Sequence, residues 1–404
     1  MKRLVALAAA IYAIALCGKL ISAQPTSTAK DSEGQRIFRF DTFGDEQLWT
    51  DTLRMQEAIA AVSPATALSV GLKVDADALP PALIAAIQAG EVNLNDPAVT
   101  IALLRLNAVI GVMGKVDDAG QLTRVGITCA LCHSAVDNSF TTGIGKRLDG
   151  WPNRDLHVGA IIALSPALTE EQRGVFNSWP RGTFDPRLQA FDGSGFIPLL
   201  PPGTKSLPVL IPPAYGLRGV GFETVTGDGP ISYWNNYVGV GQMGGQGSFS
   251  DLRIGLTIIQ KPDRVTPKLP ELLNYQLTLE APAPPSGFFN VMAARRGERL
   301  FNGKATCGTC HIAPTYTDVL SGPDPNVPFL HAPAETGMEP VYATRSATGM
   351  YRTSPLRGIW QHPPYFHDGR AATLGDVVNH YDRHFNLNLS AQQKADLVEF
   401  LKSL

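Results

Sequence analysis

The sequence predicts a mainly α-helical protein of two domains with long loops. Apolar residues recur at helical spacing between residues 45 and 106 and again over the last 14 residues. The chain of 404 residues contains 39 glycines and 31 prolines, a large share for a helical protein, which predicts much ordered loop. A chain of this length favours two domains. The run APAPP at residues 281–285 is the best candidate for a short, stiff spacer between them.

The N-terminus has the pattern of an export signal over residues 1–23. Two basic residues precede an apolar run at 4–17, and Ser22 and Ala23 precede the expected cleavage site. This run is too short for a membrane span, and no later stretch approaches the roughly 18 apolar residues that a span requires. A lipid anchor on Cys17 is disfavoured because a leucine precedes it where a small residue is expected. We therefore expect a periplasmic protein with no membrane span.

The charge of the chain argues against two classes of partner. The formal net charge is −2 at pH 7, and there is no run of basic residues. Nucleic acid and anionic membrane surfaces select proteins whose lysines and arginines are clustered. We therefore expect no nucleic-acid partner and no binding to a membrane surface.

Two pentapeptides carry the strongest functional signal. Residues 129–133 read CALCH, and residues 307–311 read CGTCH. The pattern C-x-x-C-H attaches haem c, because two thiols three positions apart reach both vinyl groups of one porphyrin while the histidine binds the iron. A redox dithiol and a zinc site are the alternatives. The two pairs lie far apart for a zinc site, and neither has the βαβ setting of a thioredoxin-like dithiol.

The expected cofactors are two covalently bound haem c groups. Of the five cysteines, all but Cys17 lie inside the two motifs. Haem c is attached outside the cytoplasmic membrane, so the export signal and the motifs support each other. The residues expected to hold the haems are Cys129, Cys132, His133, Cys307, Cys310 and His311, with the two histidines as proximal iron ligands.

Local patterns predict further elements between the motifs. Thr169 and Gln172 form a capping box that opens a short helix. From residue 180 to residue 267 proline and glycine interrupt any long periodicity, most densely at 227–247. The aromatic residues of that dense stretch, Trp234 among them, either line a haem face or anchor a packed loop.

The C-terminal region has the pattern of a small helical haem domain. Residues 288–301 read as an amphipathic helix that leads into the second motif, and Ser390 with Gln393 caps a closing helix. The predicted domains are an N-terminal haem domain with an extended loop region at 24–280, a proline-rich linker at 281–287 and a C-terminal cytochrome c domain at 288–404.

Three further motifs follow one another in the C-terminal region. They are YRTSPLR at 351–357, PYFHDGR at 364–370 and VVNHY at 377–381. In this order they resemble the bacterial dihaem cytochrome c peroxidase superfamily, which includes the dihaem enzymes that mature tryptophylquinone cofactors and, more distantly, dihaem rubber oxygenases. The resemblance covers residues 290–404. It implies two cytochrome-c-like domains packed face to face, each with one haem, and a small electron donor such as a cytochrome or a cupredoxin.

The resemblance also places the distal ligand of the C-terminal haem near His380 and Tyr381. Tyr381 aligns best, His380 is chemically the stronger ligand, and Met350 is a third candidate. Methionine would raise the haem potential, whereas tyrosinate or histidine would lower it. Arg370 lies in the PYFHDGR motif, whose residues in the family support the haem edge and propionates. Relatives can hold calcium between the domains, but no acidic cluster here supports calcium.

The N-terminal region departs from the peroxidase pattern. Family members follow an aromatic-Trp-Asp-Gly-Arg motif with a glutamate, whereas here Trp234 precedes two asparagines and no glutamate follows for dozens of residues. Peroxide cleavage needs a group that moves a proton between the two oxygens, and Glu223 is the candidate replacement. His157 has three readings: a sixth ligand to the first iron, a distal base, or an ordinary buried histidine. His331 and His362 lie in proline-rich loops and are expected at the surface.

Two hypotheses of function from different classes follow. The first is a periplasmic dihaem enzyme that reduces hydrogen peroxide with electrons from a small donor protein. The second is a dihaem electron carrier with no substrate of its own, and a less favoured third is an oxygen-activating dihaem oxidase or oxygenase. The PYFHDGR motif favours the enzyme, and the missing glutamate favours the carrier.

Overall fold

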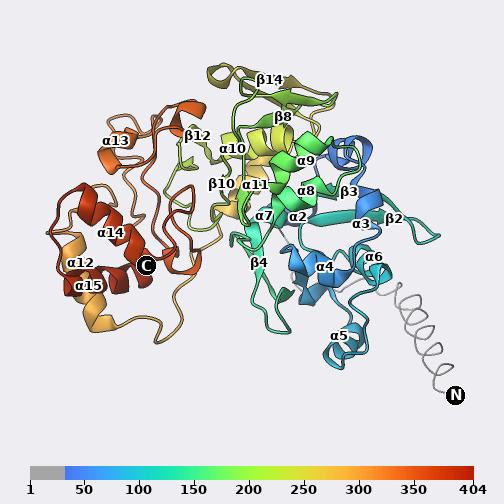
Figure 1. The fold of residues 1–404 in the computed structure, drawn as a ribbon, viewed down its shortest axis with the longest axis horizontal. Helices are drawn as coiled ribbons and strands as arrows, with labels where there is room; N and C mark the ends of the chain where they lie inside the picture. The colour runs from blue at the N-terminus through green and yellow to red at the C-terminus, as the bar shows by residue number, and fades with distance from the viewer. Residues whose placement is uncertain (1–31) are drawn as a thin grey trace.

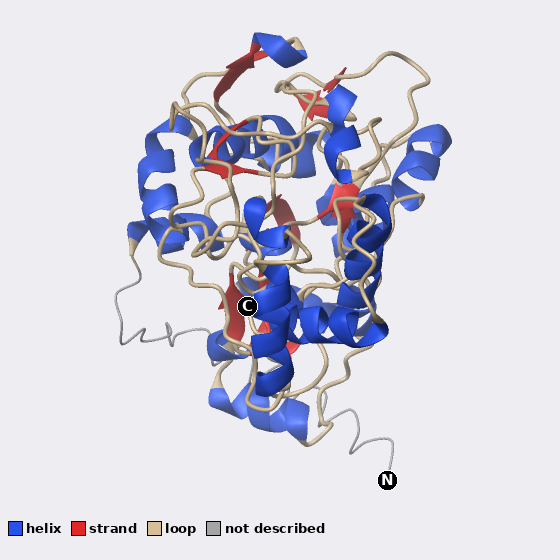
Figure 2. Ribbon diagram, turned by 90° about the vertical axis from the view of Figure 1, so that its left-hand side faces the viewer, coloured by secondary structure: helices blue, strands red, loops and turns tan. Residues whose placement is uncertain are grey.

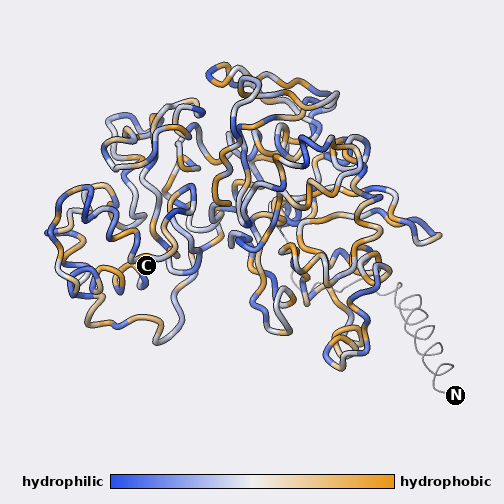
Figure 3. Tube along the Cα trace, in the orientation of Figure 1, coloured by the Kyte–Doolittle hydropathy of each residue, from blue (hydrophilic) through white to orange (hydrophobic). Residues whose placement is uncertain are grey.

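The computed structural model describes residues 32–404, so the expected signal peptide and Cys17 lie outside the described residues. Within the described part, no helix is both long enough and apolar enough to cross a membrane. Figure 3 shows the hydropathy along the chain, where apolar and polar residues alternate over short distances.

The helices are short, and none of those described is longer than 12 residues. They are α2 (Glu33–Phe40), α3 (Met55–Ile59), α4 (Pro64–Ser69), α5 (Pro81–Gln88), α6 (Pro97–Arg105), α7 (Ala130–His133), α8 (Val158–Ala163), α9 (Glu170–Asn177), α10 (Ile231–Tyr237), α11 (Leu269–Gln276), α12 (Val291–Phe301), α13 (Pro333–Thr336), α14 (Leu374–His384) and α15 (Ala391–Lys402). Helices α2 to α11 form a larger region, and α12 to α15 gather in a smaller one beside it (Figure 1).

Strands in the described chain pair two by two, and each pair is a separate sheet. The antiparallel pairs are β2 (Val112–Val116) with β3 (Leu122–Ile127), β4 (Ser134–Val136) with β6 (Arg147–Asp149), β7 (Thr183–Phe184) with β10 (Val209–Leu210), β8 (Gln189–Phe191) with β9 (Phe196–Pro198), β11 (Phe222–Glu223) with β12 (Gly229–Pro230), and β13 (Ser248–Asp251) with β14 (Leu256–Ile259). The parallel pair is β1 (Val74–Asp75) with β5 (Ile144–Gly145).

The fold is therefore mixed rather than clearly mainly α, which corrects part of the predicted fold class. Figure 2 shows the small strands scattered among helices and long loops. Glycine and proline stop the helices early, and the extended segments between them pair because their backbone groups need partners. The helical predictions hold where caps are local: Thr169 with Gln172 opens α9, and Ser390 with Gln393 opens α15.

The glycine-dense stretch at 227–247 is more regular than the sequence predicts. It contains α10, followed by a π-helical turn at Val238–Gln242. Trp234 and Tyr237 on α10 are buried, and their rings meet edge to face at 5.3 Å. Tyr237 also packs against Phe249 of β13 at 5.2 Å. These aromatic contacts hold α10 in the core of the larger region.

The smaller region is organised by the crossing of α12 and α15. At the crossing Gly297 lies so close to α15 that an added Cβ would stand 2.0 Å from the backbone oxygen of Asp396. The neighbouring Arg296 pairs with the Asp396 carboxylate at 2.7 Å. Only glycine permits this approach, because any side chain would meet backbone rather than a movable side chain.

Replacing Gly297 with alanine should destabilise the protein by about 1–3 kcal/mol, the usual cost of overpacking a tight contact. The matched control is Gly174→Ala on α9, where no atom lies within 4 Å of the added Cβ. That control should be neutral or stabilising by about 1 kcal/mol, because alanine favours helix more than glycine does. Urea unfolding of the purified full-length variants measures both. Equal stability of the two variants would contradict the tight crossing.

Candidate functional site

Both C-x-x-C-H motifs face one cavity of about 720 Å³. Its lining comes from both regions of the chain and is largely apolar, and a pocket of this size is within the range of small-molecule and cofactor sites. The motif residues in the lining are Cys129, Cys132, His133, Cys307, Cys310 and His311. The structure therefore brings together two motifs that are far apart in the sequence.

The first motif forms α7, a single helical turn. Desolvation raises the pKa of the Cys129 and Cys132 thiols to about 12, so both are protonated at neutral pH. A redox dithiol needs a lowered thiol pKa, so these thiols do not fit that alternative. The Nδ1 of His133 donates a hydrogen bond to the Pro212 carbonyl at 3.0 Å, and desolvation lowers the pKa of the ring to about 4. The ring is therefore neutral, with Nε2 as its free nitrogen.

The second motif repeats this arrangement with a different local structure. Cys307 opens a 3-10 turn, and desolvation raises the pKa of its thiol to about 11. The Nδ1 of His311 donates to the Tyr316 carbonyl at 3.0 Å, and burial lowers the pKa of this ring. A backbone acceptor on the far nitrogen is what orients and polarises a histidine that binds a metal.

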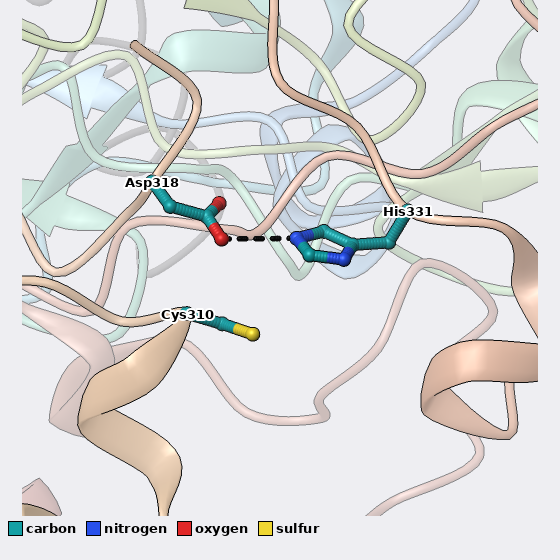
Figure 4. A group of neighbouring side chains, drawn as sticks. All are labelled: Cys310, Asp318 and His331. Carbon is teal, nitrogen blue, oxygen red and sulfur yellow. Dashed lines mark hydrogen bonds and ion pairs between the residues drawn. The ribbon is translucent and has the colours of Figure 1, made fainter. Parts of the chain in front are cut away.

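His331 lies beside the second motif and is buried, not at the surface as predicted. Its two ring nitrogens lie 2.9 Å from Asp318 Oδ2 and 2.9 Å from Glu335 Oε2. The bond to Asp318 raises the pKa of His331 to about 9, so the ring is an imidazolium that donates at both nitrogens. Figure 4 shows the Asp318–His331 pair with Cys310 beside it. Although these three side chains are close, His331 has no free lone pair for a metal.

The three residues predicted as distal ligands at the second motif differ in whether they line the cavity. Tyr381 on α14 lines the cavity, and desolvation raises its pKa. The Nε2 of His380 instead donates to the Thr336 carbonyl at 2.9 Å, and its ring stacks on His384. Neither His380 nor Met350 is among the residues that line the cavity. Tyr381 is thus the candidate that the structure places at the motif.

The predicted catalytic residues also differ in placement. His157 is the N-cap of α8, where its Nδ1 accepts a hydrogen bond from Ala160 N–H at 3.2 Å, and it does not line the cavity. Trp234 lines the cavity, and its indole Nε1 has no partner among the described residues. Glu223, at the end of β11, lines the cavity as well. The β11–β12 pair leads directly into α10, so Glu223 and Trp234 lie on consecutive elements that both contribute to the cavity lining.

Glu223 is a buried carboxyl with 8% of its surface exposed. Desolvation raises its pKa to about 7, and the nearby charge of Arg352 partly opposes this shift. Arg352 also lines the cavity, and its Nη1 donates to the Phe222 carbonyl at 2.7 Å. A carboxyl with a pKa near neutrality can both give and take a proton at working pH.

The cavity holds arginines that the sequence analysis did not single out. Arg370 pairs with Asp368 at 3.3 Å, lies over the Phe366 ring and does not line the cavity, so its predicted contact with a cofactor remains a prediction. The arginines that do line it are Arg154, Arg352 and Arg357. Two of them belong to the YRTSPLR motif, which is a signal that could have found them. Arg154 follows no recognisable motif.

The comparisons with known proteins concern part of the chain. No family model matches it. It is 31% identical over 129 residues to the methylamine utilization protein MauG of Methylorubrum extorquens, covering 28% of this chain and 34% of that protein. It is 30% identical over 148 residues to the cytochrome-c peroxidase IdrP1 of a Pseudomonas species, covering 27% of this chain and 39% of that protein.

Two solved structures also match part of the chain. A MauG-like protein associated with microbial copper homeostasis matches at 21% identity and a TM-score of 0.27, covering 35% of this chain and 54% of that one. Hydrazine synthase of Kuenenia stuttgartiensis matches at 26% identity and a TM-score of 0.25, covering 37% of this chain and 57% of that one.

The curated relatives are a MauG protein and cytochrome-c peroxidases, so part of this chain is similar to oxidoreductases of that kind. This similarity confirms the resemblance to the dihaem cytochrome c peroxidase superfamily that the C-terminal motifs carry. The chain covers 34% and 39% of the lengths of the two relatives described. Their activities and partners therefore enter only as proposals.

The raised pKa of Glu223 predicts a pH-dependent stability. Because the pKa rises from 4.5 to about 7 on folding, the folded chain binds more protons than the unfolded chain between these values. The carboxyl's contribution is complete below pH 4.5 and is lost as the pH rises through about 7, an effect of about 3 kcal/mol. Unfolding of the full-length protein at a series of pH values measures the slope.

Glu223→Gln should remove that slope, because glutamine does not titrate. The control is Glu91→Gln, an exposed residue outside the cavity, which should keep it. A wild-type slope that survives in Glu223→Gln would show that the carboxyl ionises normally in the folded protein.

Proposed function

We propose that this protein is a periplasmic dihaem c-type enzyme that reduces hydrogen peroxide with electrons from a small donor protein, a cytochrome or a cupredoxin. The observation that carries the proposal is the shared cavity, which both C-x-x-C-H motifs line together with a buried carboxyl of raised pKa. The similarity of part of the chain to cytochrome-c peroxidases supports the same conclusion.

The residues of the cavity fit two haem c groups. Each motif presents two protonated thiols for covalent attachment and one neutral imidazole whose Nδ1 is bonded to a backbone carbonyl. The largely apolar lining suits a flat porphyrin, and the unpartnered donors of Arg154 suit acidic groups at its edge. When bound, haem supplies iron that exchanges single electrons with a donor and with peroxide.

Five residues of this chain take the proposed roles at the site. His133 and His311 would bind the irons of the two haems, and Tyr381 would supply a further ligand to the iron at the second motif. Glu223 takes a proton from one peroxide oxygen and returns it to the other, which its pKa of about 7 permits in both directions. Arg352 lies beside Glu223 and favours the carboxylate form that receives the proton.

The predicted domain boundaries, with a spacer at 281–287, remain part of this proposal, as does export to the periplasm. Trp234 is proposed as the aromatic residue that lines the path between the two motifs, since it lies in the cavity wall. Calcium has no role in the proposal.

A dihaem electron carrier is the second candidate, and one observation favours it. Neither α10 nor the π-helical turn after it contains a glutamate. The segment that carries the acid–base group in the family therefore contributes no glutamate to the cavity here. A carrier would have no turnover with peroxide, whereas the enzyme would oxidise a reduced donor when peroxide is added.

The ligand assignment predicts a spectroscopic difference between two neighbouring variants. Tyr381→Phe should convert the C-terminal haem to high spin, because phenylalanine cannot bind iron. His380→Gln should leave the spin state unchanged, because the His380 ring is already bonded to Thr336. Absorption and electron paramagnetic resonance spectra of the oxidised holoproteins measure both. A spin change in His380→Gln alone would reverse the assignment.

The acid–base role predicts a large loss of activity. Glu223→Gln should lower peroxide-dependent oxidation of a reduced small cytochrome by roughly 10²–10⁴-fold, the usual contribution of general acid–base catalysis. Glu91→Gln is the control for a change on the surface and should keep full activity. Pyridine haemochrome spectra must show two haems in each variant. A fully haem-loaded wild type without peroxide turnover would leave the carrier as the function.

A further inference from the structure

Arg154 carries a buried positive charge in the cavity without an acidic partner. Its Nε and Nη1 are buried, and neither has a hydrogen-bond partner among the described residues. Desolvation lowers the pKa of Arg154 to about 10, and the titratable groups that act on it are the phenols of Tyr215 and Tyr365 rather than carboxylates. A buried cation that lacks a counter-charge is costly, so this guanidinium requires an anion that the polypeptide does not supply.

The two phenols near Arg154 are already engaged. The Tyr215 hydroxyl donates to the Gly358 carbonyl at 2.9 Å, and it accepts from Gln361 Nε2 at 2.6 Å. The Tyr365 hydroxyl donates to the Ile359 carbonyl at 3.2 Å. Both phenols are neutral at physiological pH because burial raises their pKa. They therefore do not neutralise Arg154.

His362 is a second unpartnered group in the same cavity. Its Nδ1 is buried without a hydrogen-bond partner in the described chain. Burial lowers its pKa to about 3, and the charge of Arg154 adds to this effect, which places the two side chains near each other. His362 was expected at the surface, so its place in the cavity lining is a correction. As a neutral ring it can donate one further hydrogen bond from Nδ1.

Arg154 and His362 come from different regions, and both line the cavity that the first motif faces. The charge of Arg154 also lowers the pKa of His133, so the guanidinium lies close to that ring. Nearby residues join the two regions, since Trp151 and Trp360 meet edge to face at 6.2 Å. The unpartnered donors therefore lie at the junction, on the side of the cavity that holds His133.

The other arginines of the cavity have acceptors. Arg357 donates to the Gly216 and Arg218 carbonyls at 3.0 and 3.2 Å. Arg352 bonds to the Phe222 carbonyl and lies near Glu223. Among the arginines that line the cavity, Arg154 is thus the one whose guanidinium makes no hydrogen bond within the described structure.

We propose that Arg154 and His362 together bind a carboxylate, and that this carboxylate is a propionate of the haem attached at Cys129 and Cys132. The Nε–H and Nη2–H on one edge of an arginine suit the two oxygens of one carboxylate, so the unpartnered Nε–H of Arg154 can anchor such a pair, and an imidazole N–H can add a third bond. The inference rests on the proposed haem attachment. In this proposal Arg154 and His362 position the haem and close the junction between the two regions.

The test is Arg154→Gln in the full-length holoprotein, with Arg36→Gln as a control that removes one exposed positive charge. Redox titration and redox-difference infrared spectra of the propionates are the readouts. In Arg154→Gln the midpoint potential of the N-terminal haem should fall, because a lost positive charge favours the ferric state, and its propionate bands should shift. Arg154→Lys should keep most of the potential but still shift the bands, since lysine lacks the planar fork. Arg36→Gln should match the wild type.

His362→Leu provides an independent variant if Arg154→Gln does not accumulate. It should shift the propionate bands of the same haem and leave those of the other haem unchanged. Acetate added to the wild-type holoprotein should have no effect on either readout. Acetate binding that Arg154→Gln abolishes would assign the site to a soluble carboxylate and overturn the proposal.

The failure of this inference differs from the failure of the proposed function. Unchanged potentials and propionate bands in variants that still carry two haems would refute the roles of Arg154 and His362 alone. A wild-type protein with fewer than two haems by pyridine haemochrome would refute the proposed function itself.

Discussion

One hydrogen bond to a backbone carbonyl orients each of the two cavity imidazoles, and the rest of the site depends on these two bonds. Pro212 supplies the acceptor for His133, and Tyr316 supplies it for His311. Both acceptors lie in segments without helix or strand. The long loops therefore position the chemistry, because a carbonyl that accepts from Nδ1 fixes the tautomer and the orientation of each ring.

What could be predicted from the sequence is what short stretches decide. The capping box of Ser390 and Gln393 spans four residues, and the helix it opens is present. The pairing of small strands and the helix α10 could not be predicted, because they depend on distant partners. Tyr237 is held by Phe249 from another element, and no local periodicity reports that contact. Proline and glycine mark where helices stop, but they do not show which extended segments then pair.

The candidate site also combines features that short stretches of sequence decide with features that depend on distant residues. The C-x-x-C-H motifs are complete within five residues each, and the structure brings both to one cavity. His331 looked like a surface histidine because its loop is rich in proline, yet Asp318 and Glu335 enclose it. Arg154 carried no local signal at all. Its significance comes from its surroundings, because the titratable groups that act on its charge are the phenols of Tyr215 and Tyr365 rather than carboxylates, and only the tertiary structure shows this.

The cavity has walls from both regions of the chain, and this bears on the order in which haem attachment and folding take place. If each motif binds its own porphyrin as proposed, neither porphyrin can enter after the two regions have closed over the motif sulfurs that line the cavity. Attachment must therefore act on an open chain, and final packing must follow it. Under the proposed haem attachment, the polypeptide has to stay open until both porphyrins are bonded, so slow collapse would be a requirement for this protein rather than a defect.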